Sequence, residues 1–351
     1  MNNPTAGSGG LNRLRDLTDD YLPDGNWFKW AVTVLLVYLL VAVLIGIYWS
    51  FAPARFDVQD RAAVYAAEDG GSVVTGSVTT AALMGVMETL LEKPGGFLHN
   101  DRFPPGLWLD NIPNWEYGVL IQSRDLARAM REVHSRSQSQ STEDPDLAMA
   151  EPRLNFQSDS WVLPASESEY RTGLKYLRSY SRRLSDVNAS DAQFYARADN
   201  LRYWLSTVDI RLGSLSQRLS ASVGQHRVNT DLAGDQSATQ STSAPGEMLV
   251  RTPWTEIDDV FFEARGTAWA LIHFLKAAQV DFGDVLKDKN AEVSMTQIIR
   301  ELEGTQETVW SPMILNGTGF GMLANHSLVM ASFISRANAA IVDLRDLLSQ
   351  G

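Results

Sequence analysis

The sequence predicts a mainly α-helical protein, in which a single transmembrane helix is followed by a helical bundle containing a long antiparallel helical hairpin. Three observations support this fold class. An uncharged apolar run lies near the N-terminus, a heptad pattern of apolar residues extends over residues 194–219, and the same alternation of four- and three-residue spacings recurs over residues 330–348. Apolar residues make up 44% of the 351 residues and charged residues 21%, which excludes a disordered or collagen-like chain.

The composition also narrows the chemistry. The formal net charge is -12, which argues against a basic nucleic-acid-binding protein. The chain has no cysteine, so disulfides, thiolate zinc sites, iron–sulfur clusters and cysteine nucleophiles are excluded. We therefore expect no cofactor and no nucleic-acid partner.

The apolar run favours a membrane anchor over residues 27–54, after a flexible tail over residues 1–26. No charged residue occurs between Trp30 and Ala54. A helix needs about 20 such residues to cross the hydrocarbon core, and tryptophans at both ends, Trp30 and Trp49, suit the headgroup level. We expect residues 30–51 (Trp30–Phe51) to contact membrane lipid. No second run of this kind is seen, which indicates a single-pass protein.

A cleavable signal peptide is the alternative, because Ala52-Pro53-Ala54 offers small residues at a suitable spacing. The apolar run is longer than the usual 7–15 residues of a signal peptide, and about 29 residues precede it, so an uncleaved anchor is favoured. Three positive charges precede the span and two follow it closely: Arg13, Arg15 and Lys29, then Arg55 and Arg61. By the positive-inside rule the large C-terminal part would be periplasmic and the anchor would lie in a bacterial inner membrane.

Residues 55–165 read as a helical region with long Pro/Gly-rich and Ser-rich loops. A brief strand is expected at residues 73–78 and a helix at residues 81–91, which Lys93-Pro94-Gly95-Gly96 would end. Another helix is expected over about 114–133, followed by a polar stretch at 135–142 and a turn at 143–145.

Residues 166–223 give the clearest helical signal. Eight apolar positions alternate spacings of four and three: Phe194, Ala198, Leu201, Leu205, Val208, Leu212, Leu215 and Leu219. The preceding stretch has compatible spacing, and only a short connection at residues 188–191 separates the two. This arrangement predicts the antiparallel hairpin.

The rest of the chain divides into a connection and a second helical part. Residues 224–250 are rich in Ser, Thr, Gly and Gln and are expected to be a flexible linker. Residues 251–351 are expected to form a C-terminal helical region that packs on the hairpin, with helices over about 253–278, 295–303 and 322–348.

Motifs for catalysis or metal binding are not found. No HExxH, no Glu three residues before a His, no GxSxG and no phosphate-loop pattern occurs. Glu256, Asp259 and Glu263 could bind a cation on one helix face, but acidic residues that favour the helix dipole explain them more simply. We therefore predict no catalytic residue, no metal site and no enzyme activity.

Charge patterning suggests an interaction surface. Arg171, Lys175, Arg178 and Arg182 fall at i, i+4, i+7 and i+11 and would form one basic stripe. Residues 166–223 carry a net charge of +3, nine Lys and Arg against six Asp and Glu. An acidic protein or an anionic lipid could bind this stripe. The favoured alternative is pairing within the chain, for which residues 251–351, with a net charge of -5, could supply the acids.

A second candidate surface is the loop between Lys93 and Gly106, dense in Pro, Gly and aromatic residues. Its candidate recognition residues are Phe97, His99, Asp101 and Arg102. A structural corner is the simpler interpretation, and a recognition loop is the more specific one.

Six strings support a resemblance to a known family: EKPGGFLHNDRFPPG, LDNIPNWEYGVL, RSQSQSTEDPDLAMAEP, SWVLPASESEYR, FYARADNLRYWL and RLGSLSQRLSASVG. Together they resemble a family of proteobacterial inner-membrane proteins of unknown function, over nearly the whole chain. The resemblance implies an envelope protein of a Gram-negative bacterium with one N-terminal anchor. It implies no activity, substrate or catalytic residue.

The function these patterns favour is a membrane-anchored helical interaction or scaffold protein of the bacterial cell envelope, able to self-associate through its heptad seam. One alternative is a periplasmic ligand-binding or sensory domain with a pocket lined by Trp108, Trp115 or Trp161. A further alternative is an envelope hydrolase with an unrecognised carboxylate site.

Overall fold

The computed structural model describes residues 26–137, 142–186, 191–228, 247–311, 313–318 and 321–350. Eleven α-helices and one pair of short strands make up its regular structure in these residues, and the mainly helical fold class is confirmed. The chain divides into two compact units, residues 1–48 and 49–351, which are considered separately below. The expected flexible tail lies outside the described residues, apart from Asn26.

The first unit contains helix α2, Asn26–Trp49. Its 24 residues span about 36 Å at 1.5 Å per residue. Lys29 is the only charged residue in the helix, and most of its large apolar side chains are exposed, whereas Ala42 and Gly46 are buried. A helix that is apolar on every side lacks the polar face that water would require.

Two described helices are long and apolar enough to cross a membrane, residues 27–49 and the last helix, α12 (His326–Ser349). The two differ in burial. Helix α12 packs one face against other helices of the bundle and buries Met330, Ile334, Ala337, Ile341, Leu344 and Leu348 there. Its apolar composition is therefore explained by the core of the second unit.

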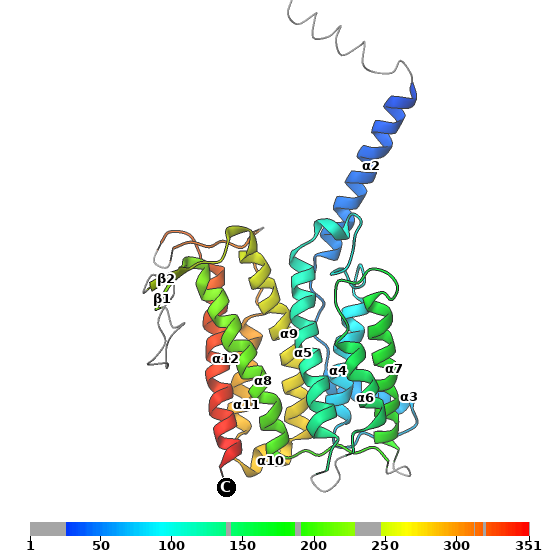
Figure 1. Ribbon diagram of the computed structural model, residues 1–351, viewed down its shortest axis with the longest axis vertical. Coiled ribbons are helices and arrows are strands. Elements are labelled where there is room, and N and C mark those ends of the chain that lie inside the picture. The colour runs from blue at the N-terminus through cyan, green and yellow to red at the C-terminus, as the bar shows by residue number, and fades with distance from the viewer. Residues whose placement is uncertain are drawn as a thin grey trace, which may run out of the picture. The chain divides into compact units, whose positions relative to one another are not determined.

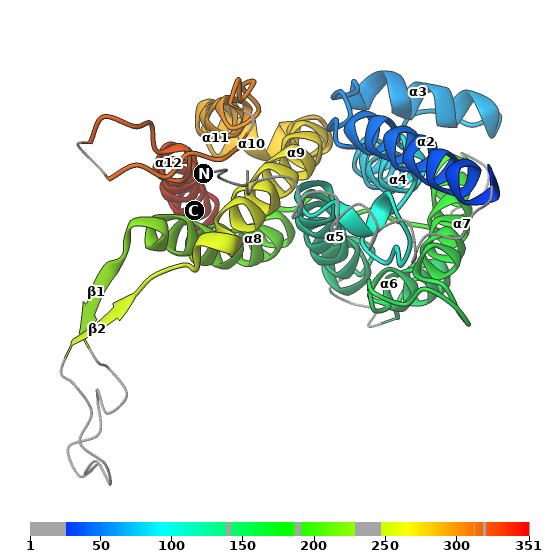
Figure 2. The ribbon, with the colours of Figure 1, turned by 90° about the horizontal axis from the view of Figure 1, so that it is seen from above.

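The second unit is a bundle of two helix groups (Figures 1 and 2). The first group contains α3 (Val58–Glu68), α4 (Ser77–Glu92), α5 (Asn111–Ala129), α6 (Pro145–Leu154) and α7 (Ser166–Ser185). The second contains α8 (Ala198–Ser220), α9 (Ile257–Asp281), α10 (Gly283–Asp288), α11 (Glu292–Gly304) and α12. A π-helical turn, Met130–His134, extends α5, and short 3-10 turns occur at Gly106–Trp108, Ala221–Val223 and Trp254–Glu256. Strand β1 (Gln225–Val228) pairs antiparallel with β2 (Glu247–Val250).

The two groups meet chiefly where α5 packs on α9, the most extensive helix–helix contact in the bundle. Two glycines permit this contact. A Cβ atom on Gly118 would lie 2.2 Å from the carbonyl oxygen of Glu263, and one on Gly266 would lie 1.9 Å from that of Trp115. The backbones of the two helices therefore approach more closely than any side chain would allow.

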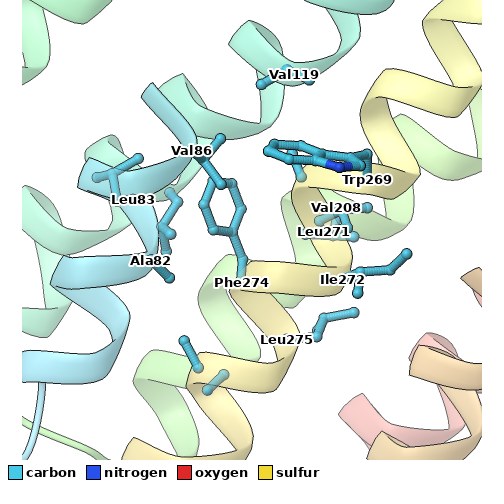
Figure 3. Close-up of a cluster of buried hydrophobic side chains, with 14 of the residues drawn as sticks. Ala82, Leu83, Val86, Val119, Val208, Trp269, Leu271, Ile272, Phe274 and Leu275 are labelled. Carbon is cyan, nitrogen blue, oxygen red and sulfur yellow. The ribbon is translucent and has the colours of Figure 1, made fainter. Parts of the chain in front are cut away.

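A continuous apolar core surrounds this contact. Figure 3 shows Phe274 of α9 directed toward Leu83 and Val86 of α4, with Val119 of α5 beyond them. Nearby, the rings of Trp115 and Trp269 pack edge to face with centroids 5.2 Å apart. Helix α9 thus contributes apolar side chains to both groups.

The predicted hairpin at residues 166–223 is corrected in one respect. Two long helices form there, but α7 packs on α6 and α4, whereas α8 packs on α12 (Figure 2). Residues 191–197 before α8 are held to the bundle, because the N–H of Tyr195 donates to the carbonyl of His134 and the ring of Phe194 packs against that of Phe282 at 5.6 Å. The heptad seam of α8 therefore meets the similarly spaced seam of α12, rather than α7.

Other expectations also need correction. No strand forms at 73–78, because α4 begins at Ser77 and its first turns are buried. Three helices, α3, α6 and α10, were not predicted. Asp144 caps α6 by accepting from the N–H groups of Asp146 and Leu147, with Pro145 as the first helical residue, where a turn was expected. Part of the expected linker forms β1 and β2; residues 229–246, and 138–141 of the polar stretch, lie outside the described residues.

The close contact between α5 and α9 gives the first prediction. We expect Gly266→Ala to destabilise the bundle by about 1–3 kcal/mol, because its methyl group would displace backbone rather than a flexible side chain. Gly213→Ala in α8 is the matched control, since its nearest neighbour would be the Asn338 amide at 3.6 Å, and it should be neutral or slightly stabilising. Urea unfolding followed by circular dichroism compares the two. Equal stability of the variants would contradict the close contact.

Candidate functional surfaces

The loop between α4 and α5 is organised by a buried ion pair. The side chains of Lys93 and Glu116 are fully buried and form a salt bridge. The carboxylate of Glu116 also accepts from the backbone N–H groups of Leu98 at 2.9 Å and His99 at 2.8 Å. The ammonium of Lys93 donates to the carbonyl of Gly96 at 2.5 Å. Burial raises the pKa of Glu116 to about 7, although Lys93 and the two amides favour the carboxylate.

The four predicted recognition residues occupy different environments in this loop. Phe97 is buried and packs edge to face on Tyr170 at 5.5 Å. His99 is partly buried, which lowers its pKa, and its ring stacks on Tyr117 at 5.8 Å. Partial burial raises the pKa of Asp101.

Arg102 is the one exposed member of the four, and it donates to the carbonyl of Asp159 at 3.2 Å. Phe97 and His99 therefore support the corner of the fold. Recognition by this loop stays a prediction, and its exposed apolar residues lie further along, in the segment from Phe103 to Trp108.

The predicted basic stripe lies on α7 and divides into two halves. Arg178 pairs with Glu68 at 2.6 Å and with Asp69 at 3.1 Å, at the end of α3, and Arg182 lies 3.7 Å from Asp69. Arg171 and Lys175 are exposed and form no ion pair with a described residue. The intramolecular acids thus come from α3, and not from residues 251–351 as the charge balance suggested.

Most other basic residues of the segment 166–223 are also paired within the chain. Arg183 pairs with Asp144 at 2.8 Å, Arg211 with Asp125 at 2.8 Å, and Arg218 with Glu263. The local excess of positive charge is therefore distributed over several helices as internal ion pairs. What remains open on α7 is the half formed by Arg171 and Lys175.

Two of the carboxylates near the start of α9, those of Asp259 and Glu263, contact other side chains of the same chain. Asp259 accepts from the side-chain amide of Asn114 at 2.7 Å, and Glu263 is held by Arg218. Burial, with the carboxylates of Asp258 and Asp110, raises the pKa of Asp259 to about 6. Among the residues that the structure describes, no group of three or more His, Asp or Glu side chains is placed to hold a metal ion.

The tryptophans suggested for a pocket do not converge. Trp115 is buried in the core, whereas Trp108 and Trp161 are exposed. A groove of about 430 Å³ lies elsewhere, between α9, the end of α11 and the start of α12, and its apolar lining includes Phe261, Val309, Trp310, Val329 and Phe333. Sequence reasoning missed this groove, although Val329 and Phe333 stand four residues apart and off the buried seam of α12.

One cation lines the groove. The guanidinium of Arg265 donates to the carbonyls of Glu307 at 2.9 Å and Gln306 at 3.2 Å, and burial lowers its pKa. These contacts hold the turn after α11 and form one wall of the groove. Arg265 therefore has a structural role at this end of the bundle.

The fold and these surfaces define a mainly helical protein with an apolar N-terminal helix. Residues 23–351 match the family DUF2333, described as uncharacterized proteins conserved in bacteria, and the chain belongs to this family. No curated protein and no solved structure matches the chain. The resemblance to an uncharacterised bacterial family is confirmed.

The ion pair of Lys93 and Glu116 gives the second prediction. We expect Lys93→Met or Glu116→Gln to lower the free energy of unfolding by about 3–5 kcal/mol, because each leaves a buried charge without its partner. The double variant should cost less than the sum of the two single changes. Asp199→Asn, which weakens the exposed pair with Arg197, is the control and should cost less than about 1 kcal/mol. Additive single changes in urea unfolding would refute the coupling.

Proposed function

We propose that the protein is a membrane-anchored helical interaction or scaffold protein of the bacterial cell envelope, held in the inner membrane by α2, with its bundle in the periplasm. The observation that carries the proposal is the contrast between the two units. Helix α2 leaves most of its large apolar side chains exposed, whereas residues 49–351 bury a continuous apolar core of their own. A lipid environment is the natural surrounding of the first unit, and water that of the second.

The contacts of residues 49–56 support an uncleaved anchor. Trp49, the last residue of α2, belongs to the bundle unit. Its ring packs so closely on Gly95 that a Cβ atom added to that glycine would lie 2.7 Å from the ring. The N–H of Phe56 donates to Nε2 of His273 at 3.2 Å, and the two rings stack at 4.2 Å. Cleavage after Ala54 would remove Trp49 from the core to which it contributes.

The anchor gives the third prediction. We expect the wild-type chain to stay in the membrane fraction after alkaline carbonate extraction and to keep its N-terminal mass. Combined Leu36→Arg and Leu40→Arg should move it out of that fraction, because each arginine at the centre of a span costs about 2.5–3.5 kcal/mol of insertion. Leu36→Ile with Leu40→Ile is the control. A mature mass lacking the first 54 residues would refute the anchor.

Arg171 and Lys175 are the residues proposed to bind an acidic protein partner or an anionic lipid. They lie four residues apart on α7, both are exposed, and Arg178 and Arg182 next to them are already neutralised by α3. A pair of free cations on a rigid helix can attract an acidic surface without reorganising the fold. Self-association remains part of the proposal, through surfaces other than the α8 seam, because that seam is buried against α12.

This surface gives the fourth prediction. With a photo-crosslinking residue at Ser168 in intact cells, Arg171→Glu combined with Lys175→Glu should reduce the crosslinked products several-fold while the circular dichroism spectrum stays unchanged. Lys287→Glu combined with Arg300→Glu makes the same change in net charge on other helices and should leave the products unchanged. Equal crosslinking in both double variants would exclude α7 as the contact surface.

A ligand-binding or sensory function is the second candidate. The groove of about 430 Å³ favours it, since it is lined mainly by apolar and aromatic side chains and has the size of a small-molecule site.

A further inference from the structure

The ten tryptophans of the chain fall into three sets. Trp27, Trp30 and Trp49 belong to α2, and Trp115, Trp204 and Trp269 are buried in the core. The remaining four are exposed on the bundle: Trp108, Trp161, Trp254 and Trp310. Trp254 and Trp310 are 80% and 92% exposed, values that leave almost the whole indole outside the fold.

All four exposed tryptophans lie in the connections at one end of the bundle, which we call the loop end. It comprises residues 93–110, 155–165, 221–228, 247–256 and 304–325, of which 312, 319 and 320 lie outside the described residues. Helices α5, α9 and α12 begin at this end, and α10 lies at the opposite one (Figure 1).

Contacts between the connections show that the loop end is continuous. The ring of Phe103 packs on that of Trp161 at 5.5 Å. Trp254, Asp110 and Met313 line one shallow hollow. The amide of Asn316 donates to the carbonyl of Ser222 at 2.8 Å, which ties the last connection to the one after α8.

Large aliphatic side chains are exposed on the same connections. They include Leu107, Val162, Leu163, Met248, Leu249, Met313, Met322 and Leu323. At the opposite end, near α10, the exposed apolar residues include Val280 and Val293, and no described Trp or Phe is exposed there. Soluble proteins rarely gather this much exposed apolar surface in one place without a partner.

The chain enters the bundle unit at the same end. Trp49 packs beside Gly95 and Leu98, in the loop that continues to Phe103 and Trp108. Because Trp49 is also the last residue of α2, no free linker separates the end of the span from this loop. A bilayer crossed by α2 would therefore lie within a few residues' reach of the loop end.

We propose that the loop end is a membrane-docking surface, whose exposed tryptophans and aliphatic side chains insert into the interfacial region of the lipid bilayer. This inference rests on the proposed anchor. Indole rings favour the membrane interface, where an apolar face and a polar N–H are both satisfied. The apolar side chains come from several separate connections, so the surface they form is irregular. Lipid can adapt to such a surface, whereas a protein partner would need a matching shape.

The charges of the loop end define the kind of contact. The loop end holds six acidic residues and four basic ones: Asp101, Asp110, Asp159, Glu247, Glu256 and Glu307 against Lys93, Arg102, Arg227 and Arg251. Because the acids are in excess and Lys93 is buried in its pair with Glu116, net attraction to anionic headgroups does not supply the contact. Partition of apolar and aromatic side chains does, and the contact should depend little on salt.

The chain offers a direct test because it contains no cysteine. Single cysteines introduced by Trp310→Cys and Leu163→Cys place an environment-sensitive fluorophore on the loop end. Val293→Cys does so at the opposite end, and Leu40→Cys does so within α2. The full-length chain is reconstituted into vesicles of phosphatidylethanolamine and phosphatidylglycerol. Quenching by doxyl-labelled lipid is then compared with quenching by iodide present on both sides.

The outcomes separate this inference from the anchor. Lipid quenching at residues 40, 163 and 310, several-fold stronger than at residue 293, supports the docking surface. Lipid quenching at residue 40 alone, with iodide quenching at 163 and 310 equal to that at 293, overturns docking and leaves the anchor. Protection of 163 and 310 from both quenchers overturns lipid docking in favour of a protein cover. Absence of lipid quenching at residue 40 overturns the anchor itself.

Discussion

The close packing of α5 on α9 is the constraint on which the rest of the bundle depends. Gly118 and Gly266 place backbone against backbone, so the two helix groups share one core instead of forming two. Residues of α5 close to Gly118 make further contacts that hold this part of the bundle. Trp115 packs on Trp269 of α9, while Glu116, one position further, points to the loop before α5 and binds Lys93. One turn of α5 therefore fixes both the joint between the groups and the shape of the adjacent loop.

The buried ion pair of Lys93 and Glu116 contributes more to the conformation of the loop before α5 than to the free energy of unfolding. Taking the charges of Lys93 and Glu116 out of water costs several kcal/mol, which their mutual attraction roughly offsets. The pair also fixes the loop backbone, because the carboxylate of Glu116 accepts hydrogen bonds from the N–H groups of Leu98 and His99. The ammonium of Lys93 donates to the carbonyl of Gly96. These backbone groups of the loop are therefore hydrogen-bonded although the loop has no regular secondary structure. The exposed residues from Phe103 to Trp108 follow directly after this fixed part of the loop.

The sequence predicted the helices that have a strong apolar periodicity, but it did not predict which helices pack against one another. Apolar spacing identified α2, α8 and α12, but the spacing of α8 is equally compatible with α7 or α12 as a neighbour. The spacing alone does not distinguish these two neighbours. Helix α6 was missed because Asp144-Pro145 signals both a turn and a helix start. The basic stripe lies on α7 as expected, yet the acids that pair with Arg178, Glu68 and Asp69, lie 110 and 109 residues earlier in the chain. The exposed tryptophans carried no periodic signal, because they lie in connections.

The segment between α2 and α3 connects these observations to the proposed envelope role. Residues 49–56 do not form a free linker: Arg55 pairs with Glu303 of α11 at 3.0 Å, and Phe56 stacks on His273 of α9. The ring of His273 is held neutral, since Nδ1 donates to the carbonyl of Trp269 at 2.8 Å while Nε2 accepts from Phe56, and burial lowers the pKa of His273 to about 4. If α2 is the proposed anchor, these contacts would keep the bundle close to the membrane, because they leave no free linker after the span. A short attachment of this kind would suit the proposed scaffold function.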